Sequence, residues 1–271
     1  YCQLGRTTIK TSRRREYAPA KKVLGELRGF FDSGGECGVV TLAGSGEPTL
    51  NTKIGDIIRE VKDMTDTPLA VLTNSSLLTR EEVRNDLLNA DVVVPSLDAA
   101  SPDTFKKINR QAEGITVSDV IDGLKEFRKE YAGEVRLEVM AVAGLNDTKK
   151  EVDELRQAIG IIRPDSIDLN TVVRPPAESY AKPLSQPRLE WMARKLKAET
   201  VKPFSLEGRD EHKTGLEAVS SLLKRRPCTL KDVASSLGLH ENEAVKYLNM
   251  LEKDEGFSHE KGYYHFKKGG R

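Results

Sequence analysis

The sequence predicts an α/β fold, in which an incomplete barrel of βα units is followed by a small separate module. Between Gly38 and Val173, short β-branched runs alternate with segments of helical periodicity, which is typical of a parallel sheet built from βα units. After Phe204 this alternation stops. A chain of 271 residues is long enough for one large and one small domain. We therefore predict domains over residues 1–203 and 204–271.

Five strands are predicted from the apolar runs. They cover residues 39–42, 69–72, 92–94, 135–142 and 167–172. We expect one more strand ahead of Tyr1, which gives about six βα units. Because a closed barrel needs eight, the prediction is a partial (β/α)6 TIM-like barrel.

Helices are predicted between these strands, over residues 52–64, 79–88, 116–131, 148–160 and 186–199. In residues 116–131, apolar side chains recur on one helical face. Thr116 followed by Asp119 resembles a capping box. Ser101-Pro102 predicts another helix start, with proline at the first helical position.

The C-terminal segment predicts a winged-helix-like domain. Helices are expected over 214–225, after Thr229, and over 241–253, and residues 256–266 predict a hairpin that turns at Lys261-Gly262. The segment is nearly neutral, and its third helix carries Glu241 and Glu243. We therefore favour docking to a protein, or simple packing, over nucleic-acid binding, which stays the alternative.

Composition indicates the cellular compartment of the protein. The 43 Lys and Arg balance the 42 Asp and Glu, and no apolar run reaches the roughly 20 residues of a membrane helix. Cys2, Cys37 and Cys228 are far apart and show no disulfide spacing, which fits a reducing compartment. We predict a cytoplasmic protein without a membrane partner.

Polar and small residues follow the predicted strands. The segments are Gly44–Pro48, Thr73–Ser75, Ser96–Ala99, Gly144–Asp147 and Arg174–Pro176. Each alone is explained by turn formation. Because the carboxyl ends of parallel strands meet at one edge, the series predicts a site for a polar ligand.

Three motifs resemble those of the radical S-adenosylmethionine (SAM) superfamily. Tyr1-Cys2 resembles the end of its CxxxCxxC loop, and Gly44-Ser45-Gly46-Glu47-Pro48 resembles its GGEP-type motif. Ser96–Ala99, with Phe105 and Ile108–Arg110, is similar to a segment of wyosine-type tRNA-modifying enzymes. The resemblance covers roughly the first 200 residues.

The resemblance implies cofactors and an activity. Cys2 would be one of three thiolates that hold a [4Fe–4S] cluster, and SAM would bind the remaining iron. Reductive cleavage of SAM to a 5′-deoxyadenosyl radical would then modify a substrate, with ferredoxin or flavodoxin as the reductant. The implied SAM-binding residues are Tyr1 near the adenine, the backbone of Gly44, Ser45, Gly46 and Glu47 at the amino group, and Asn74, Ser96 and Asp98 at other polar parts.

The chain also departs from the family pattern. The first two cluster cysteines are absent from it, and its motif has Gly-Ser-Gly-Glu-Pro where two adjacent glycines are commoner. We expect Cys37 and Cys228 to be core or incidental thiols. We therefore expect residues ahead of Tyr1 in the full protein, and predict that the 271 residues alone cannot hold the cluster.

The positions of the basic residues indicate which class of substrate the protein binds. Residues 1–30 carry eight basic side chains against Glu16 and Glu26, which favours an anionic substrate such as RNA or a phosphorylated metabolite; a solvated basic face is the alternative. Arg174 is a candidate for binding a carboxylate or phosphate, unless it pairs with Glu178. No catalytic residue can be assigned.

Two functions remain from the sequence. The first is a radical SAM enzyme that modifies a macromolecule, RNA before protein. The second is a non-catalytic winged-helix regulator or interaction protein on a degenerate radical SAM scaffold.

Overall fold

The computed structural model describes residues 1–2, 7, 9–44, 46–173, 176–200, 216–237, 239, 241–252, 254, 256–260 and 262–266. The chain divides into two compact units. One comprises Tyr1, Thr7–Val173 and Glu178–Val201, and the other comprises Cys2–Arg6, Arg174–Ala177 and Lys202–Arg271. The predicted boundary after residue 203 lies outside the described residues.

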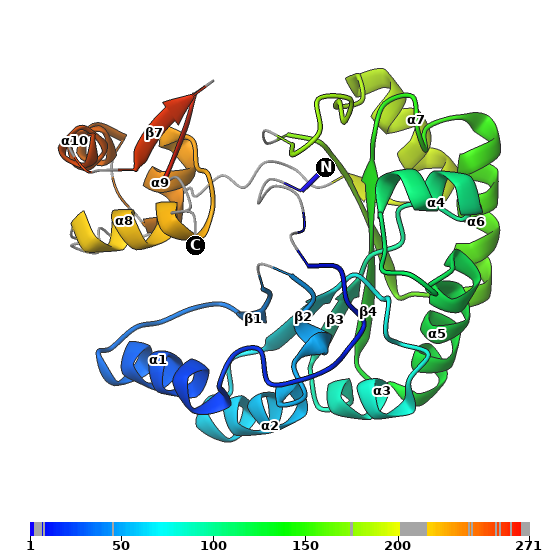
Figure 1. The fold of residues 1–271 in the computed structure, drawn as a ribbon, viewed down its shortest axis with the longest axis horizontal. Helices are drawn as coiled ribbons and strands as arrows, with labels where there is room; N and C mark the ends of the chain where they lie inside the picture. The colour runs from blue at the N-terminus through cyan, green and yellow to red at the C-terminus, as the bar shows by residue number, and fades with distance from the viewer. Residues whose placement is uncertain are drawn as a thin grey trace. The chain divides into compact units, whose positions relative to one another are not determined.

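The first unit is built on a parallel six-stranded sheet in the order β1-β2-β3-β4-β5-β6. The strands are β1 (Val40–Leu42), β2 (Leu69–Thr73), β3 (Val92–Pro95), β4 (Glu134–Ala141), β5 (Ser166–Thr171) and β6 (Glu199–Thr200). This sequential parallel order, with helices between the strands, confirms the predicted partial TIM-like barrel (Figure 1).

The sixth described strand is not the one expected ahead of Tyr1. The sequence prediction extended a helix to residue 199, whereas α7 (Gln186–Leu196) stops at Leu196. Lys197 adopts a left-handed conformation with φ of 56°, which ends the helix. Glu199 and Thr200 then pair with Asp168 and Leu169 of β5.

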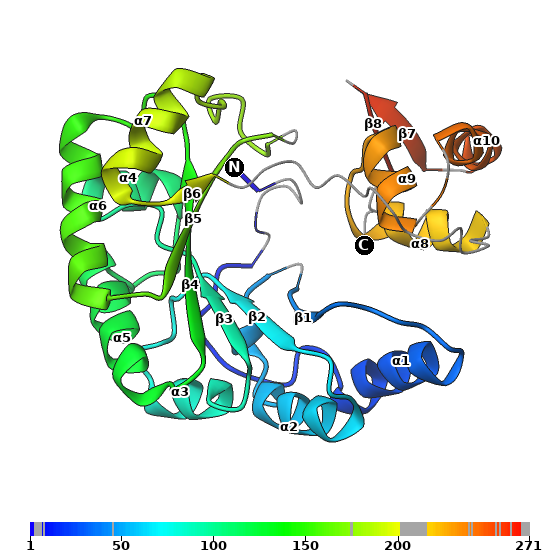
Figure 2. The same cartoon turned by 180° about the vertical axis from the view of Figure 1, so that it is seen from behind.

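The other helices of this unit are α1 (Ala20–Asp32), α2 (Ile54–Met64), α3 (Glu81–Leu87), α4 (Pro102–Ile108), α5 (Val117–Glu130) and α6 (Lys149–Ile162), with the short 3₁₀ helix η1 (Pro48–Leu50). The helices α2, α3, α5 and α6 cover one face of the sheet (Figures 1 and 2). The capping box of α5 is confirmed, because Asp119 N donates to Thr116 Oγ1 and Thr116 N donates to Asp119 Oδ2. Helix α1 had no counterpart among the predicted elements.

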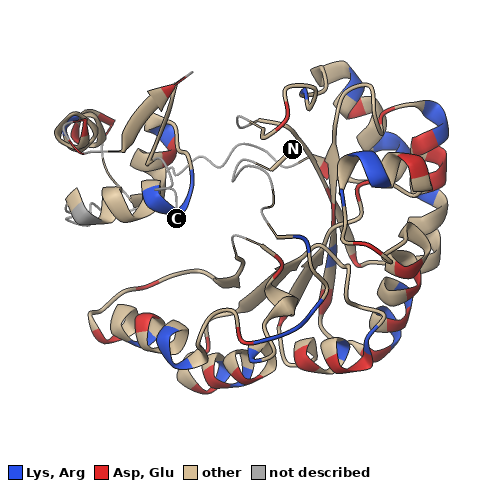
Figure 3. Ribbon diagram, viewed as in Figure 1, with Lys and Arg blue, Asp and Glu red and all other residues tan. Residues whose placement is uncertain are grey.

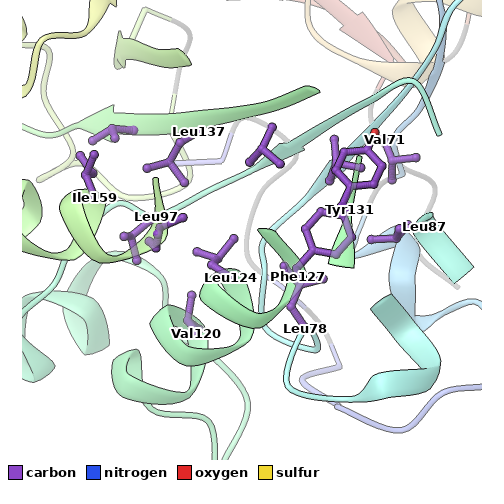
Figure 4. Packing of buried hydrophobic residues seen from close by; sticks show 14 of the residues in the cluster. Val71, Leu78, Leu87, Leu97, Val120, Leu124, Phe127, Tyr131, Leu137 and Ile159 are labelled. Atoms are coloured by element: carbon purple, nitrogen blue, oxygen red, sulfur yellow. The ribbon is translucent and has the colours of Figure 1, made fainter. Parts of the chain in front are cut away.

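The main hydrophobic core lies between the sheet and these helices. In β4, Val135, Leu137, Val139 and Ala141 are buried in it, and the intervening residues lie on the opposite face. Leu124 and Phe127 of α5 pack beside Leu137, and the Phe127 ring stacks on Tyr131 with centroids 4.7 Å apart (Figure 4). The helix-free face of the sheet is thereby left for polar side chains.

The second unit contains α8 (Leu216–Arg225), α9 (Leu230–Leu237), α10 (Glu241–Leu251) and an antiparallel hairpin of β7 (Phe257–Glu260) and β8 (Tyr263–Phe266). These elements follow the predicted order. Their own core includes Val219, Leu223, Val233 and Leu248, together with the fully buried Cys228. Across all described residues, we find no helix with the length and apolar character needed to span a bilayer.

Candidate active site

The carboxyl ends of β1, β2 and β3 are joined by hydrogen bonds between predicted site residues and their neighbours. Asn74 N, after β2, donates to Glu47 Oε2, after β1, at 2.6 Å. Ser75 Oγ donates to the carbonyl oxygen of Ser96, after β3, at 2.9 Å. The structure therefore brings these loops to one edge of the sheet, as the parallel topology predicts.

Glu47 is a positioning residue in this edge. Its Oε1 accepts bonds from Thr49 N at 3.1 Å, Thr49 Oγ1 at 2.6 Å and Thr73 Oγ1 at 2.6 Å, in addition to the Asn74 bond on Oε2. The carboxylate caps η1 and ties the loop after β1 to the end of β2. Its side chain is engaged with protein, so any contact with a ligand falls to the backbone of this loop.

The main chain of the loop after β1 is open to a ligand. Gly44 and Gly46 are exposed, and a Cβ on Gly46 would meet no atom within 4 Å. A Cβ on Gly44 would lie 3.2 Å from the carbonyl oxygen of Gly46, so a side chain there would crowd the loop. Ser45 lies outside the described residues. The exposure of these two glycines fits the predicted role of this backbone in binding the SAM amino group, which stays a prediction.

Asn74 is exposed at the end of β2, and its Oδ1 accepts a 3.0 Å bond from Ser76 N. The next residue, Ser75, is buried and has φ of 66°, which holds the turn in a left-handed conformation. The side-chain amide of Asn74 therefore stands on a rigid turn. Its contact with SAM stays a prediction.

Asp98, which follows β3, is buried behind this edge of the sheet. Its side chain has no exposed surface: Oδ1 accepts from Met140 N at 2.9 Å, and Oδ2 accepts from Tyr1 Oη and Asn109 Nδ2, each at 2.7 Å. Burial raises the pKa of this carboxyl, and these three bonds partly oppose the shift. Asp98 therefore positions the residues around it, and its contact with SAM stays a prediction.

Tyr1 joins this network and lies in a small apolar cluster. The cluster contains Ile108, Val142, Val172 and Ala181. The ring is half-exposed, so its predicted contact with an adenine stays a prediction. Cys2, which follows it in the chain, is exposed, and its carbonyl oxygen accepts a 3.1 Å bond from Ala177 N.

A row of polar side chains on the helix-free face was missed by sequence reasoning, apart from Ser96. Ser96 pairs with Glu138 of β4 in a bridge, and Glu138 pairs in register with Asp168 of β5. Glu138 Oε1 accepts a 2.7 Å bond from Asn170 Nδ2. The sequence does indicate a polar face on β4, because Arg136 and Glu138 alternate with apolar residues. A strand sequence alone does not show which residues of the neighbouring strands lie beside that face.

Burial raises the pKa of Glu138, and the nearby Asp98 and Asp168 raise it further, whereas the bonds from Asn170 and Ser96 oppose the shift. The ion pair beside it joins Arg136 to Asp168 at 3.4 Å. Glu138 itself takes part in none of the ion pairs among the described residues. It is therefore a carboxyl group that binds its proton more tightly than usual.

The described residues do not form a metal centre by themselves. They contain no group of three or more His, Cys, Asp or Glu side chains that could hold a metal ion. Cys37 packs against the main core, and Cys228 is buried in the core of the second unit, which confirms both as core thiols. Cys2 is thus a single thiol, so these residues fit a SAM seat but do not complete a [4Fe–4S] site.

A groove of about 720 Å³ lies elsewhere in the first unit. It lies between α1 and α2 and contains both basic and acidic side chains, which are Lys21, Arg28, Lys53, Arg59, Asp56, Glu60 and Asp63. Because the strand ends carry the glycine loop and the buried carboxyl groups, we place the functional site there and not in this groove.

One protein-family model matches the part of the sequence that contains the strand-end motifs. The sequence model of the radical SAM superfamily matches residues 1–159, which include Cys2, the glycine loop and Glu138. The chain belongs to the radical SAM superfamily. Members of this superfamily use a [4Fe–4S] cluster and SAM as cofactors.

Two curated proteins are similar to the chain over most of its length. The chain is 33% identical over 257 residues, 93% of its length, to a protein of Brachyspira hyodysenteriae named GTPase Obg, of which it covers 38%. It is 35% identical over 193 residues, 70% of its length, to a UPF0026 protein of Methanocaldococcus jannaschii, of which it covers 59%. The chain thus spans less than two thirds of either relative.

A solved structure shares the fold. The crystal structure of a radical SAM methyltransferase from Sphaerobacter thermophilus matches 68% of this chain and 57% of its own with a TM-score of 0.51 and 17% identity. At that identity the likeness concerns the radical SAM fold alone.

One predicted substrate contact lies outside the described residues, namely Arg174. Glu178, named as its alternative partner, accepts a 2.7 Å bond on Oε1 from Arg110 Nη1. Arg110 belongs to the segment that resembles wyosine-type enzymes, and the pair ties the end of α4 to the loop ahead of α7.

Proposed function

We propose that this chain is the SAM-binding part of a radical SAM enzyme that modifies a macromolecule, with RNA favoured over protein. In this class the cluster supplies the electron that cleaves SAM, and a hydrogen atom is then taken from the substrate. The observation that carries the proposal is the open glycine loop after β1, held by the Glu47 carboxylate at the same sheet edge as Asn74 and Ser96.

The chain's own residues prepare this seat. Glu47 fixes the backbone that is to accept bonds from the SAM amino group, and Asp98 fixes Tyr1 beside the apolar cluster. Both carboxylates act before any ligand arrives, because their bonds to protein groups are already made. A preorganised seat lowers the entropic cost of binding.

Exposed positive charge supports an RNA substrate. Arg14 is used within the fold, since it contacts Asp86 and the carbonyl oxygens of Thr49 and Asn51. Six of the other basic residues predicted to bind anions are exposed and form no ion pair with described residues: Lys10, Arg13, Arg15, Lys21, Lys22 and Arg28. Several lie along α1 and the segment before it (Figure 3).

The similarity of Ser96–Ala99 and Ile108–Arg110 to wyosine-type tRNA-modifying enzymes favours tRNA within this proposal. The proposal also includes residues 216–266 as a winged-helix module that docks a protein or nucleic acid, supported by the order of α8, α9, α10 and the β7–β8 hairpin. Ferredoxin or flavodoxin is the proposed reductant.

Retention of bulk tRNA at low and high salt tests the RNA substrate. We expect binding that weakens steeply with salt, because phosphate contacts release counterions. Lys21→Glu with Lys22→Glu on α1 should weaken it at least about tenfold, since two contacts become repulsive. Arg194→Glu with Lys195→Glu, two exposed basic residues at the end of α7, is the matched control and should have little effect. Failure to retain tRNA at low salt would argue for a protein or small-molecule substrate.

The activity itself is tested in a version of the protein that includes residues ahead of Tyr1. Under reducing, anaerobic conditions we expect methionine and 5′-deoxyadenosine to form from SAM. If that protein carries no further cysteines and forms no 5′-deoxyadenosine, the non-catalytic regulator becomes the better reading.

A further inference from the structure

The row of polar side chains on the helix-free face of the sheet consists of Ser96, Glu138, Asp168 and Asn170. It contains a hydrogen-bond acceptor that is not among the residues proposed to bind SAM. Parallel register places Ser96 beside Glu138, and Met140 beside Asn170. Three strands, β3, β4 and β5, therefore contribute to the surroundings of one carboxyl group. The helices α2, α3, α5 and α6 cover the other face of the sheet, so this row lies on the helix-free face (Figure 2).

The two oxygens of Glu138 differ in what they bind. Oε1 accepts a 2.7 Å bond from Asn170 Nδ2, which is a normal length for an N–H donor. Among the described residues, Oε2 has only Ser96 Oγ at 3.5 Å, well beyond the usual 2.5–3.0 Å of an O–H···O bond. The half-buried carboxyl thus keeps one oxygen whose acceptor capacity is nearly unused.

The charge around Glu138 selects the kind of ligand. Asp98 follows β3 and Asp168 lies on β5, while the positive charge of Arg136 is directed to Asp168 and Glu134. A phosphate or carboxylate would be repelled there, whereas a neutral or cationic group with an N–H donor would satisfy Oε2. The phosphates of an RNA substrate would be bound by the exposed basic residues instead.

We propose that Glu138, held by Asn170, is a specificity-determining residue that accepts a hydrogen bond from an N–H group on the edge of the substrate's nucleobase. This inference rests on the proposed RNA substrate and names the residue that contacts its base. It assigns Oε2 of Glu138 to the base and the carbonyl groups of the glycine loop to SAM.

The test compares the 271-residue chain with its Glu138→Gln variant, with guanosine, cytidine and uridine as separate probes in calorimetric titrations. Adenosine is left out because it resembles part of SAM. In the variant, Asn170 Nδ2 retains the amide oxygen as its acceptor, so the amide N–H₂ group takes the place of Oε2 and faces the nucleobase donor. We therefore expect affinity for the best-bound nucleoside to fall about tenfold.

Glu134→Gln is the matched control, because Glu134 lies on the same face of β4 at its exposed amino end. It should bind the nucleosides as the parent chain does. Glu138→Ala provides a second variant, which should lose affinity without presenting a competing donor. Circular dichroism of every variant shows that it is folded.

Three results would overturn the inference. They are no detectable binding of any of the three nucleosides by the parent chain, equal binding by folded Glu138→Gln, or a loss in that variant of SAM affinity alone. Failure of the proposed function has a different signature, which is the absence of salt-sensitive tRNA retention and of 5′-deoxyadenosine formation.

Discussion

At the scale of single residues, the carboxylates of two predicted site residues are bonded to neighbouring protein groups. Glu47 accepts four hydrogen bonds across two loops, and Asp98 accepts three while fully buried. Their sequence motifs predicted both residues at strand ends, and the structure has them there. Their roles depend on which donors the fold brings to each oxygen, which a motif does not specify.

Replacing Glu47 with glutamine should destabilise the first unit. One carboxylate oxygen becomes an N–H₂ group that faces a donor, either Asn74 N or the Thr49 and Thr73 groups, and that donor loses its acceptor. We expect a loss of about 1–3 kcal/mol in the free energy of unfolding, measured in urea. Glu36→Gln, at an exposed position, is the control, and an equal effect of the two substitutions would contradict the role assigned to Glu47.

Glu138 should make stability depend on pH. Because the fold raises the pKa of this carboxyl, the folded state holds its proton more tightly than the unfolded chain does. Its contribution to stability is therefore fully present below the ordinary glutamate pKa and is lost as pH rises through the folded value. Urea midpoints measured over this range should fall less with rising pH in Glu138→Gln than in the parent chain. Parallel pH profiles would show that Glu138 titrates normally.

At the scale of elements, local sequence patterns predict most helices and strands. They do not predict how much space the neighbouring elements leave for a larger side chain. Gly123 lies within α5, where a Cβ would come within 2.7 Å of Thr79 N and 2.8 Å of Leu78 C. Gly29 lies within α1, and a Cβ there would meet nothing within 4 Å. Helix propensity favours alanine equally at both positions, so the surroundings decide the outcome.

Gly123→Ala should therefore destabilise the protein by about 1–3 kcal/mol through overpacking against backbone atoms. Gly29→Ala should stabilise it by up to about 1 kcal/mol. Chemical unfolding of the two variants checks both signs. A stabilising Gly123→Ala would mean that α5 and the loop ahead of α3 separate more easily than their contact indicates.

Element boundaries show the same limit. The amphipathic pattern of α5 and its capping box were predictable, because both are local. The end of α7 and the two-residue strand β6 were not, because β6 exists through its pairing with β5. Helix α1 was also missed, although its buried face packs on the main core through Leu24.

At the scale of the whole molecule, the single exposed Cys2 limits what the chain can bind. After anaerobic reconstitution and desalting, we expect the 271-residue chain to retain far less than the roughly four irons and four sulfides of a [4Fe–4S] cluster. Cys2→Ser should retain the same small amount, which would mark it as unspecific. A full complement of iron that disappears in Cys2→Ser would show that these 271 residues do hold a cluster.

The sequence by itself determined the α/β class, the order of most elements and the edge of the sheet where the polar strand-end residues gather, because hydrophobic period, caps and strand-end residues are local properties. Only the tertiary structure decided that Asp98 is buried, that Glu47 joins two loops, and that Glu138 stands between Ser96 and Asn170 with a nearly free oxygen. The physical reason is that burial and hydrogen-bond satisfaction depend on partners from other strands, and parallel register sets those partners only once the sheet has formed.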